Sequence, residues 1–245
     1  MTYNPWPIGK VPPEFRRPEL EEIEKAGYSF QDPRDVITIF ENRLAIYSGS
    51  KYCVVLDCAS HGIFLSLKYL TSIRTVTIPR RTYVSVGMQI HHSGNILALD
   101  EIPWEGLYQL RGTPIFDGSA RFRPNMFVGG AHSLQVLSFQ IKKRLPIGRG
   151  GAVLTDDLEA ANWLRNARYD GRDLATPYDS VNHVNQLGWH MYMTPEDAAR
   201  GLLILDRLGD VDYPDIAGDQ SYPDTLSWFK KIGIIEERTP SQRKR

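Results

Sequence analysis

The chain has 245 residues, with 42% hydrophobic and 24% charged residues, a composition typical of globular proteins with a sizeable buried core. Its 29 basic and 29 acidic residues balance, which excludes a global field that would attract nucleic acid or an anionic membrane. No apolar run is long enough to span a bilayer, and the N-terminus lacks the pattern of a signal peptide. Cys53 and Cys58 fit no zinc-binding spacing. We therefore expect reduced thiols and a cytoplasmic protein.

The hydrophobic pattern predicts alternating helices and strands along most of the chain. A short helix at Glu19–Lys25 is followed by one within Pro33–Tyr47, and further helices are expected from Ser60 to about Leu70, over Thr82–Ile90, from Asp157 through Leu164, and after the Thr194 cap. Apolar, β-branched segments predict strands at Tyr52–Leu56, Thr75–Ile78, Asn95–Leu99, Thr113–Asp117, Leu134–Phe139 and Ala152–Thr155.

This alternation predicts an α/β fold, with a mixed, mostly parallel sheet of roughly seven strands between helices. We expect an N-terminal arm and short helix at residues 1–34, a large domain at 35–209, and an irregular C-terminal remnant or tail at 210–245. Residues 211–223 carry little periodicity, and a last short element is expected within Trp228–Ile235.

The segment Leu137–Val153 is the most informative part of the chain. A strand ends at Ser138, a lysine-bearing loop follows, and the glycine-rich turn Gly148–Gly151 leads into an apolar strand. A lysine at the carboxyl end of a strand lies where α/β domains bind ligands. If its amine is desolvated or close to other cations, its pKa falls and it can form a Schiff base. From local sequence alone, a solvated Lys-Lys-Arg loop is the simpler interpretation.

From Glu41 to about Leu208, the chain resembles the DegT/DnrJ/EryC1/StrS family of sugar aminotransferases, which depend on pyridoxal phosphate (PLP). The resemblance is carried first by Ser138-Phe139, by Lys143, by Gly148-Arg-Gly-Gly-Ala152 and by Thr155-Asp-Asp157. It implies that Lys143, rather than Lys142, is the Schiff-base lysine, and that the Ser138 hydroxyl lies near the cofactor phosphate.

A second match is Ile115–Ala120, which resembles the family's strand ending in Glu-Asp-Ala-Ala. It implies that Asp117 pairs with the pyridine nitrogen and keeps the ring an electron sink. Taken alone, an aspartate that ends a strand is more often a turn residue.

Two more matches imply further contacts with the cofactor. The turn Cys58-Ala59-Ser60 opens a helix, whose N–H groups can bind the phosphate while Ser60 also serves as a cap. In Pro79–Val84, the resemblance implies that Tyr83 stacks on the ring, although such a tyrosine is more often a packing residue.

The chain also departs from the family pattern. Ala120 and Arg149 replace residue types that the family prefers. In Gly188–Met193, His190 stands where an asparagine would reach the phosphate of a neighbouring subunit's cofactor. The chain also ends soon after the point where the family's C-terminal domain would start. We therefore expect substrate recognition to be reduced, rebuilt or supplied by a partner. The histidines are scattered, with no carboxylate at ligand spacing, so no metal site is expected.

The resemblance implies a fold-type-I PLP domain and a homodimer with a shared active site, without nucleic-acid or membrane partners. It further implies amino transfer from an amino acid to a keto group of a nucleotide-linked sugar, with glutamate as the expected amino donor. Two alternatives stay open. One is a different PLP reaction such as sugar dehydration, against which the retained lysine argues. The other is a non-catalytic homologue that binds PLP or a nucleotide sugar.

Overall fold

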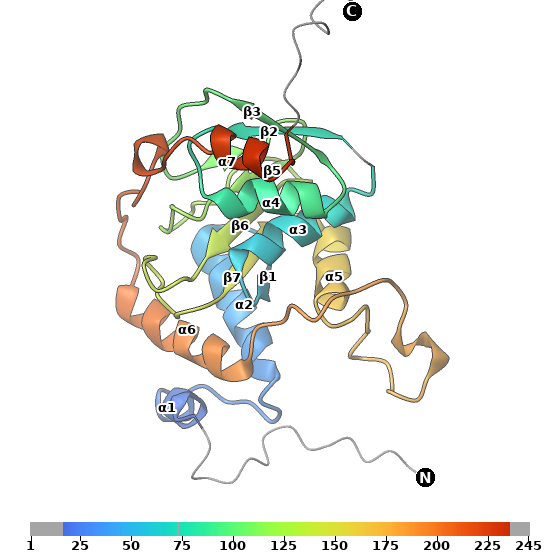
Figure 1. Ribbon diagram of the computed structural model, residues 1–245. Helices are drawn as coiled ribbons and strands as arrows, with labels where there is room; N and C mark the ends of the chain where they lie inside the picture. The colour runs from blue at the N-terminus through green and yellow to red at the C-terminus, as the bar shows by residue number, and fades with distance from the viewer. Residues whose placement is uncertain (1–16, 73, 236–245) are drawn as a thin grey trace, which may run out of the picture.

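The computed structural model describes residues 17–72 and 74–235 (Figure 1). Its helices and strands confirm the predicted elements to within a few residues, and they add a two-residue strand that the sequence did not predict. In chain order they are α1 (Glu19–Lys25), α2 (Asp35–Ser48), β1 (Tyr52–Leu56), α3 (Ala59–Tyr69), β2 (Thr75–Pro79), α4 (Val84–His92), β3 (Ile96–Asp100), β4 (Tyr108–Gln109), β5 (Ile115–Asp117), β6 (Leu134–Ser138), β7 (Gly151–Thr155), α5 (Leu158–Ala167), α6 (Pro195–Leu208) and α7 (Leu226–Lys231).

The strands form a mixed sheet, as predicted. Five strands are ordered β1-β7-β6-β5-β4, and β2 pairs in parallel with β3. Two backbone hydrogen bonds between Thr77 in β2 and Arg111, just after β4, connect the two groups. Because β4 is antiparallel to β5, and Arg111 continues β4 antiparallel to β2, the strands β1, β2, β3, β5 and β6 run in one direction. Only β4 and β7 are reversed among the strands described, so most strands share one direction although antiparallel neighbours are frequent.

The reversed strands follow from short connections. Residues 139–150 join β6 to β7 without a helix, and five residues join β4 to β5. Five residues are too few for the crossover that a parallel neighbour needs. The β6–β7 loop instead folds back on itself through backbone hydrogen bonds among Phe139, Gly148 and Gly150.

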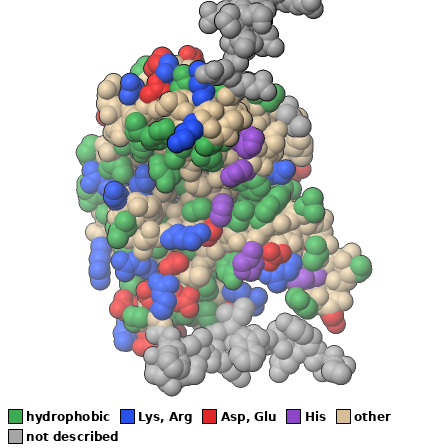
Figure 2. All heavy atoms as spheres, in the orientation of Figure 1, with side chains coloured by type: hydrophobic (Ala, Val, Ile, Leu, Met, Phe, Trp, Pro, Cys, Tyr) green, Lys and Arg blue, Asp and Glu red, His purple; other side chains and the backbone are tan. Residues whose placement is uncertain are grey.

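Alternate residues of the strands face two separate cores. In β1, Cys53 and Val55 pack on one face with α2 and α6, while Val54 and Leu56 pack on the other with α3, α4 and α5. This period of two places helices on both faces of the sheet, as predicted. Figure 2 shows basic and acidic side chains interspersed over the visible face.

Residues 210–235 return across the α3–α4 side of the sheet. The backbone N–H and the hydroxyl of Thr225 both donate to the carbonyl of Arg80. The Phe229 ring, in α7, is fully buried and lies against Gly87 of α4. Figure 1 shows α7 beside α4. Arg121 binds Asp215 through three hydrogen bonds. The segment holds little regular structure, as expected from its sequence, yet it is firmly packed against the sheet domain.

We predict that Phe229→Ala lowers the free energy of unfolding by about 3–5 kcal/mol, because it removes a fully buried ring and leaves a cavity. Trp228→Ala is the matched control, since the neighbouring Trp228 side chain is 45% exposed. Urea denaturation of wild type and both variants measures their free energies of unfolding. Equal, small effects would contradict the view that α7 belongs to the core.

Candidate active site

Lys143 lies in the loop between β6 and β7. Backbone hydrogen bonds from Phe139 to Gly150, from Gly148 to Phe139 and from Lys143 to Gln140 close this loop tightly. The Lys143 side chain is half-buried. Burial lowers the pKa of its amine below the ordinary value, and the charge of Asp117 opposes part of this shift. A lowered pKa increases the neutral, nucleophilic fraction of the amine at neutral pH.

Asp117 ends β5, which pairs in parallel with β6. Parallel strands end at the same edge of a sheet, so Asp117 and the loop bearing Lys143 meet there. The carboxylate is 6% exposed and accepts hydrogen bonds from the Tyr108 hydroxyl, at 2.9 Å, and from the Ser119 backbone N–H, at 2.9 Å. Tyr108 in turn bonds Thr82. These contacts fix the orientation of the carboxylate.

A cavity of about 680 Å³ opens at this edge. Six of the seven predicted site residues line it: Ala59, Ser60, Tyr83, Asp117, Ser138 and Lys143. The prediction that Ser60 caps α3 is wrong, because the helix begins at Ala59 and the capping residue is Cys58. The Ser60 hydroxyl instead bonds Ser85 of α4. The Tyr83 side chain is 58% exposed.

His190, the seventh predicted residue, lies elsewhere. Its ring bonds the carboxylate of Asp170 at 3.1 Å, and it is not among the residues that line the cavity. Within one chain it is therefore outside the site, and its role at a neighbouring subunit's cofactor stays a prediction.

The donor set in the cavity fits PLP. Its lining includes the start of a helix and two serine hydroxyls that could bind a phosphate, together with a half-buried lysine and a buried carboxylate. This combination suits a ligand with a phosphate, an electrophilic carbon and a basic ring nitrogen.

The glycine pair Gly150-Gly151 brings two walls of the cavity together. A Cβ on Gly151 would lie 2.4 Å from the Ala59 nitrogen and 2.6 Å from the Cys58 carbonyl carbon. Backbone atoms cannot move aside as a flexible side chain can, so only glycine permits β7 to approach the start of α3 this closely. The Gly148–Gly151 turn is thereby held beside the predicted phosphate end.

We predict that Gly151→Ala destabilises the fold by about 1–3 kcal/mol through overpacking and weakens PLP binding. Gly130→Ala is the control, because a Cβ there meets no atom within 4 Å and the backbone needs no left-handed conformation. Thermal unfolding with and without PLP measures both effects. If the two variants behave alike, the close approach has no such role.

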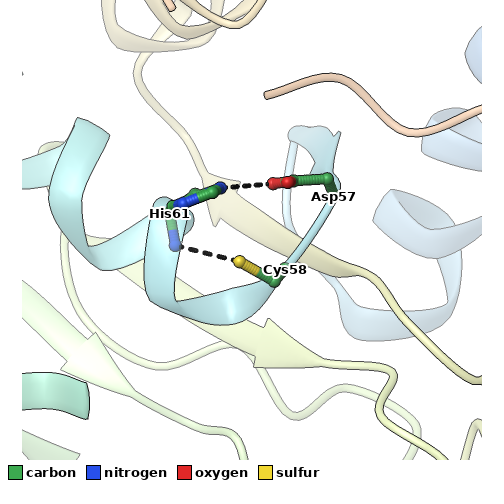
Figure 3. Close-up of side chains that lie close together, drawn as sticks. All are labelled: Asp57, Cys58 and His61. Carbon is green, nitrogen blue, oxygen red and sulfur yellow. Dashed lines mark hydrogen bonds and ion pairs between the residues drawn. The ribbon is translucent and has the colours of Figure 1, made fainter. Parts of the chain in front are cut away.

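Asp57, Cys58 and His61 cluster at the start of α3 (Figure 3). The ring nitrogen Nδ1 of His61 lies 2.6 Å from Asp57 Oδ1, and the backbone N–H of His61 donates to the Cys58 sulfur at 3.5 Å. The potential ligand atoms of the three residues lie within 4.8 Å of one another. However, Arg149 donates to the other oxygen of Asp57 at 2.8 Å, and a guanidinium group there opposes a metal cation. We interpret the cluster as an ion-pair network.

The hydrogen bond with Asp57 raises the pKa of His61 to about 10. A group whose pKa is raised by folding stabilises the protein fully below its unfolded pKa, and the stabilisation is lost as pH rises through the folded pKa. We predict that the stability difference between wild type and His61→Gln is largest below about pH 6.5 and shrinks toward pH 10. Urea denaturation of both proteins across this pH range measures the difference in their free energies of unfolding. A difference that is independent of pH would show that His61 is not protonated in the fold.

Several residues of the cavity were not predicted from the sequence. The C-terminal segment contributes Ile216, Ala217, Ser221 and Tyr222, and Trp104 stacks on Tyr222 with ring centroids 5.8 Å apart. Arg149 also lines the cavity, although the sequence marked it only as a departure. No periodicity marks residues 211–223, so nothing in the sequence placed them at the site.

Solved structures of known proteins share the fold of this chain. The sugar aminotransferase CalS13 from Micromonospora echinospora matches with a TM-score of 0.60 and 16% identity, over 78% of this chain and 64% of that one. The GDP-4-keto-6-deoxymannose-3-dehydratase ColD matches with a TM-score of 0.58 and 13% identity, over 78% and 64%. At these identities the likeness shows the fold, which is that of the fold-type-I PLP-dependent enzymes.

The sequence comparison matches part of the chain to a family model. Residues 121–235 match the model of the DegT/DnrJ/EryC1/StrS aminotransferase family, which confirms the resemblance predicted from the sequence motifs. The spore coat polysaccharide biosynthesis protein SpsC of Bacillus subtilis is 23% identical over 79% of this chain, and the aligned region is 61% of SpsC. The chain thus spans less than two thirds of the length of these relatives. No helix in the described residues is long and apolar enough to cross a membrane.

Proposed function

We propose that the protein is a PLP-dependent aminotransferase that moves an amino group from an amino acid to a keto group of a nucleotide-linked sugar. Glutamate is the expected amino donor. The observation that carries the proposal is the meeting of Lys143 and Asp117 in one cavity, with the pKa of the lysine lowered by burial. The family match supports the reaction class.

Each side chain has a distinct task in this proposal. PLP, when bound, supplies an electron sink for the amino-acid carbon. The Lys143 amine would hold the cofactor covalently, and as a free amine it would move protons as general base and general acid. The Asp117 carboxylate, held by Tyr108 and Ser119, would hold a proton at the ring nitrogen. Ser60 and Ser138 would bind the phosphate, and Tyr83 would cover the ring.

The shared active site of a homodimer is part of the same proposal. His190, exposed and bonded to Asp170, would then act at the partner's cofactor rather than at its own. Both cysteines are free thiols in the structure, which supports a reducing, cytoplasmic setting.

We predict that borohydride reduction of the PLP-treated protein fixes a pyridoxyl group on Lys143, located by peptide mass mapping. Lys142→Ala is the matched control: it removes the adjacent lysine, whose side chain is exposed, and should keep the adduct. Lys143→Ala should lose it, along with the visible absorbance of the bound cofactor. An adduct on Lys142, or none in folded wild type, would refute the proposed site.

A single-turnover assay separates the open alternatives. Conversion of bound PLP to its pyridoxamine form by glutamate supports amino transfer. No conversion by any amino donor, with the Lys143 adduct intact, favours a binding protein. Release of water from a keto-deoxy sugar nucleotide would favour dehydration, the reaction in the name of the structural relative ColD.

A further inference from the structure

Arg149 lines the cavity and bonds Asp57, which lies just before the start of α3. Its Nη2 donates to Asp57 Oδ2 at 2.8 Å, and its Nε donates to the Asp57 carbonyl at 3.2 Å. A guanidinium group carries five N–H donors, so donors remain after these two bonds. The side chain is 71% exposed, and Ala59 and Ser60 line the same cavity.

The position of Arg149 is set by backbone contacts of the glycines that follow it, and not only by the orientation of its side chain. Gly150 bridges Cys58 in parallel, and Gly151 approaches the Cys58–Ala59 peptide too closely for any Cβ. Arg149, the residue before Gly150, is therefore fixed beside Asp57. Asp57 in turn precedes the turn into α3. Contact at both the side chain and the carbonyl of Asp57 restricts the guanidinium further.

The local charge favours an anion. Asp57 contributes one negative charge, and Arg149 and a protonated His61 contribute two positive charges. Lys142 also lines the cavity. The start of α3 adds the partial positive charge of a helix N-terminus. An anion bound there would meet a net positive field and directed donors, the arrangement in which arginine binds phosphate best.

We infer that Arg149, held in place by Asp57, binds the phosphate group of a phosphate monoester in the cavity, and that Asp57 is a positioning residue. The inference rests on the proposed function in that PLP is the phosphate monoester expected there. It goes beyond that function, which assigned the phosphate to Ser60 and Ser138. Arg149 would supply a charged contact from the same chain, at a site where His190 is absent from the cavity.

The test compares PLP with pyridoxal, which lacks the phosphate. We expect Arg149→Ala to weaken PLP binding about tenfold to a hundredfold, the range for a lost hydrogen bond to a charged group, and to leave pyridoxal binding unchanged. Equilibrium titration of the cofactor's absorbance gives both dissociation constants. Arg144→Ala is the matched control, because Arg144 lies in the same loop, carries the same charge, and contacts Tyr213 and Pro214 instead.

The positioning role of Asp57 has its own readout. Asp57→Asn should reduce the preference for PLP over pyridoxal by less than Arg149→Ala does, and the double variant should show no further loss. A merely structural role of Asp57 would weaken both ligands together. Equal losses of PLP and pyridoxal affinity in Arg149→Ala, or unchanged PLP affinity, would overturn the inference.

Failure of the proposed function is distinguishable from failure of this inference. If wild type forms no adduct with PLP, calorimetric titration with inorganic phosphate tests whether the Arg149 site binds phosphate at all. Phosphate binding that is lost in Arg149→Ala and kept in Arg144→Ala supports the phosphate site without the cofactor. No phosphate binding by wild type would then overturn the inference as well.

Discussion

The close approach of β7 to the start of α3 is the constraint on which the cavity depends. Because Gly151 has no side chain, the strand passes against the Cys58–Ala59 peptide. This contact joins two segments that are distant in sequence: the helix N-terminus and the lysine-bearing loop. The helix provides N–H groups and the Ser60 hydroxyl, and the loop provides the Lys143 amine and the Arg149 guanidinium group. A bulkier residue would separate the two segments by the width of a methyl group, and the cavity would lose one of its walls.

Another wall of the cavity comes from a segment with less regular structure. Residues 212–222 have no strand or α-helix, yet Ile216 bonds the backbone of Ala120, and Asp219 bonds that of Trp104. Phe229 anchors the segment in the core behind α4. A wall without regular structure is thus held by backbone bonds on one side and by a buried aromatic ring on the other. Its side chains, such as Tyr222, contribute to the shape of the space available to a substrate.

Much of the fold could be predicted from the sequence, because its strands are short apolar runs and two of its helices, α5 and α6, begin at side-chain caps. The Thr194 side chain accepts from Asp197 N–H, and Pro195 is the first helical residue of α6, as the pattern indicates. The α4 start shifted by two residues, since Tyr83 is extended and no side-chain cap fixes the boundary. The pair of residues in β4 was missed because so short a strand has no periodicity to detect.

The site was predictable where a residue ends a strand, as Asp117 and Ser138 do, or lies in the first turn of a helix, as Ser60 does. Strand direction then brings such residues to one edge. Arg149 was not recognised as a site residue because its place depends on its contact with Asp57, some ninety positions away in the chain. Tyr222 was missed for a related reason: its position depends on tertiary contacts of an irregular segment, which local sequence does not encode.

The order of strands also governs how the molecule reaches its native state. Strand β1 pairs with β7 alone among the described strands, with Val54 opposite Val153, across roughly a hundred intervening residues. During synthesis, the chain leaves the ribosome from its N-terminus. The first strand must therefore wait, unpaired, until the glycine-rich turn and the strand after it have emerged. The walls of the cavity at β7 and the start of α3 meet in that same late step, and the wall from Ile216 to Tyr222 can be added only after it.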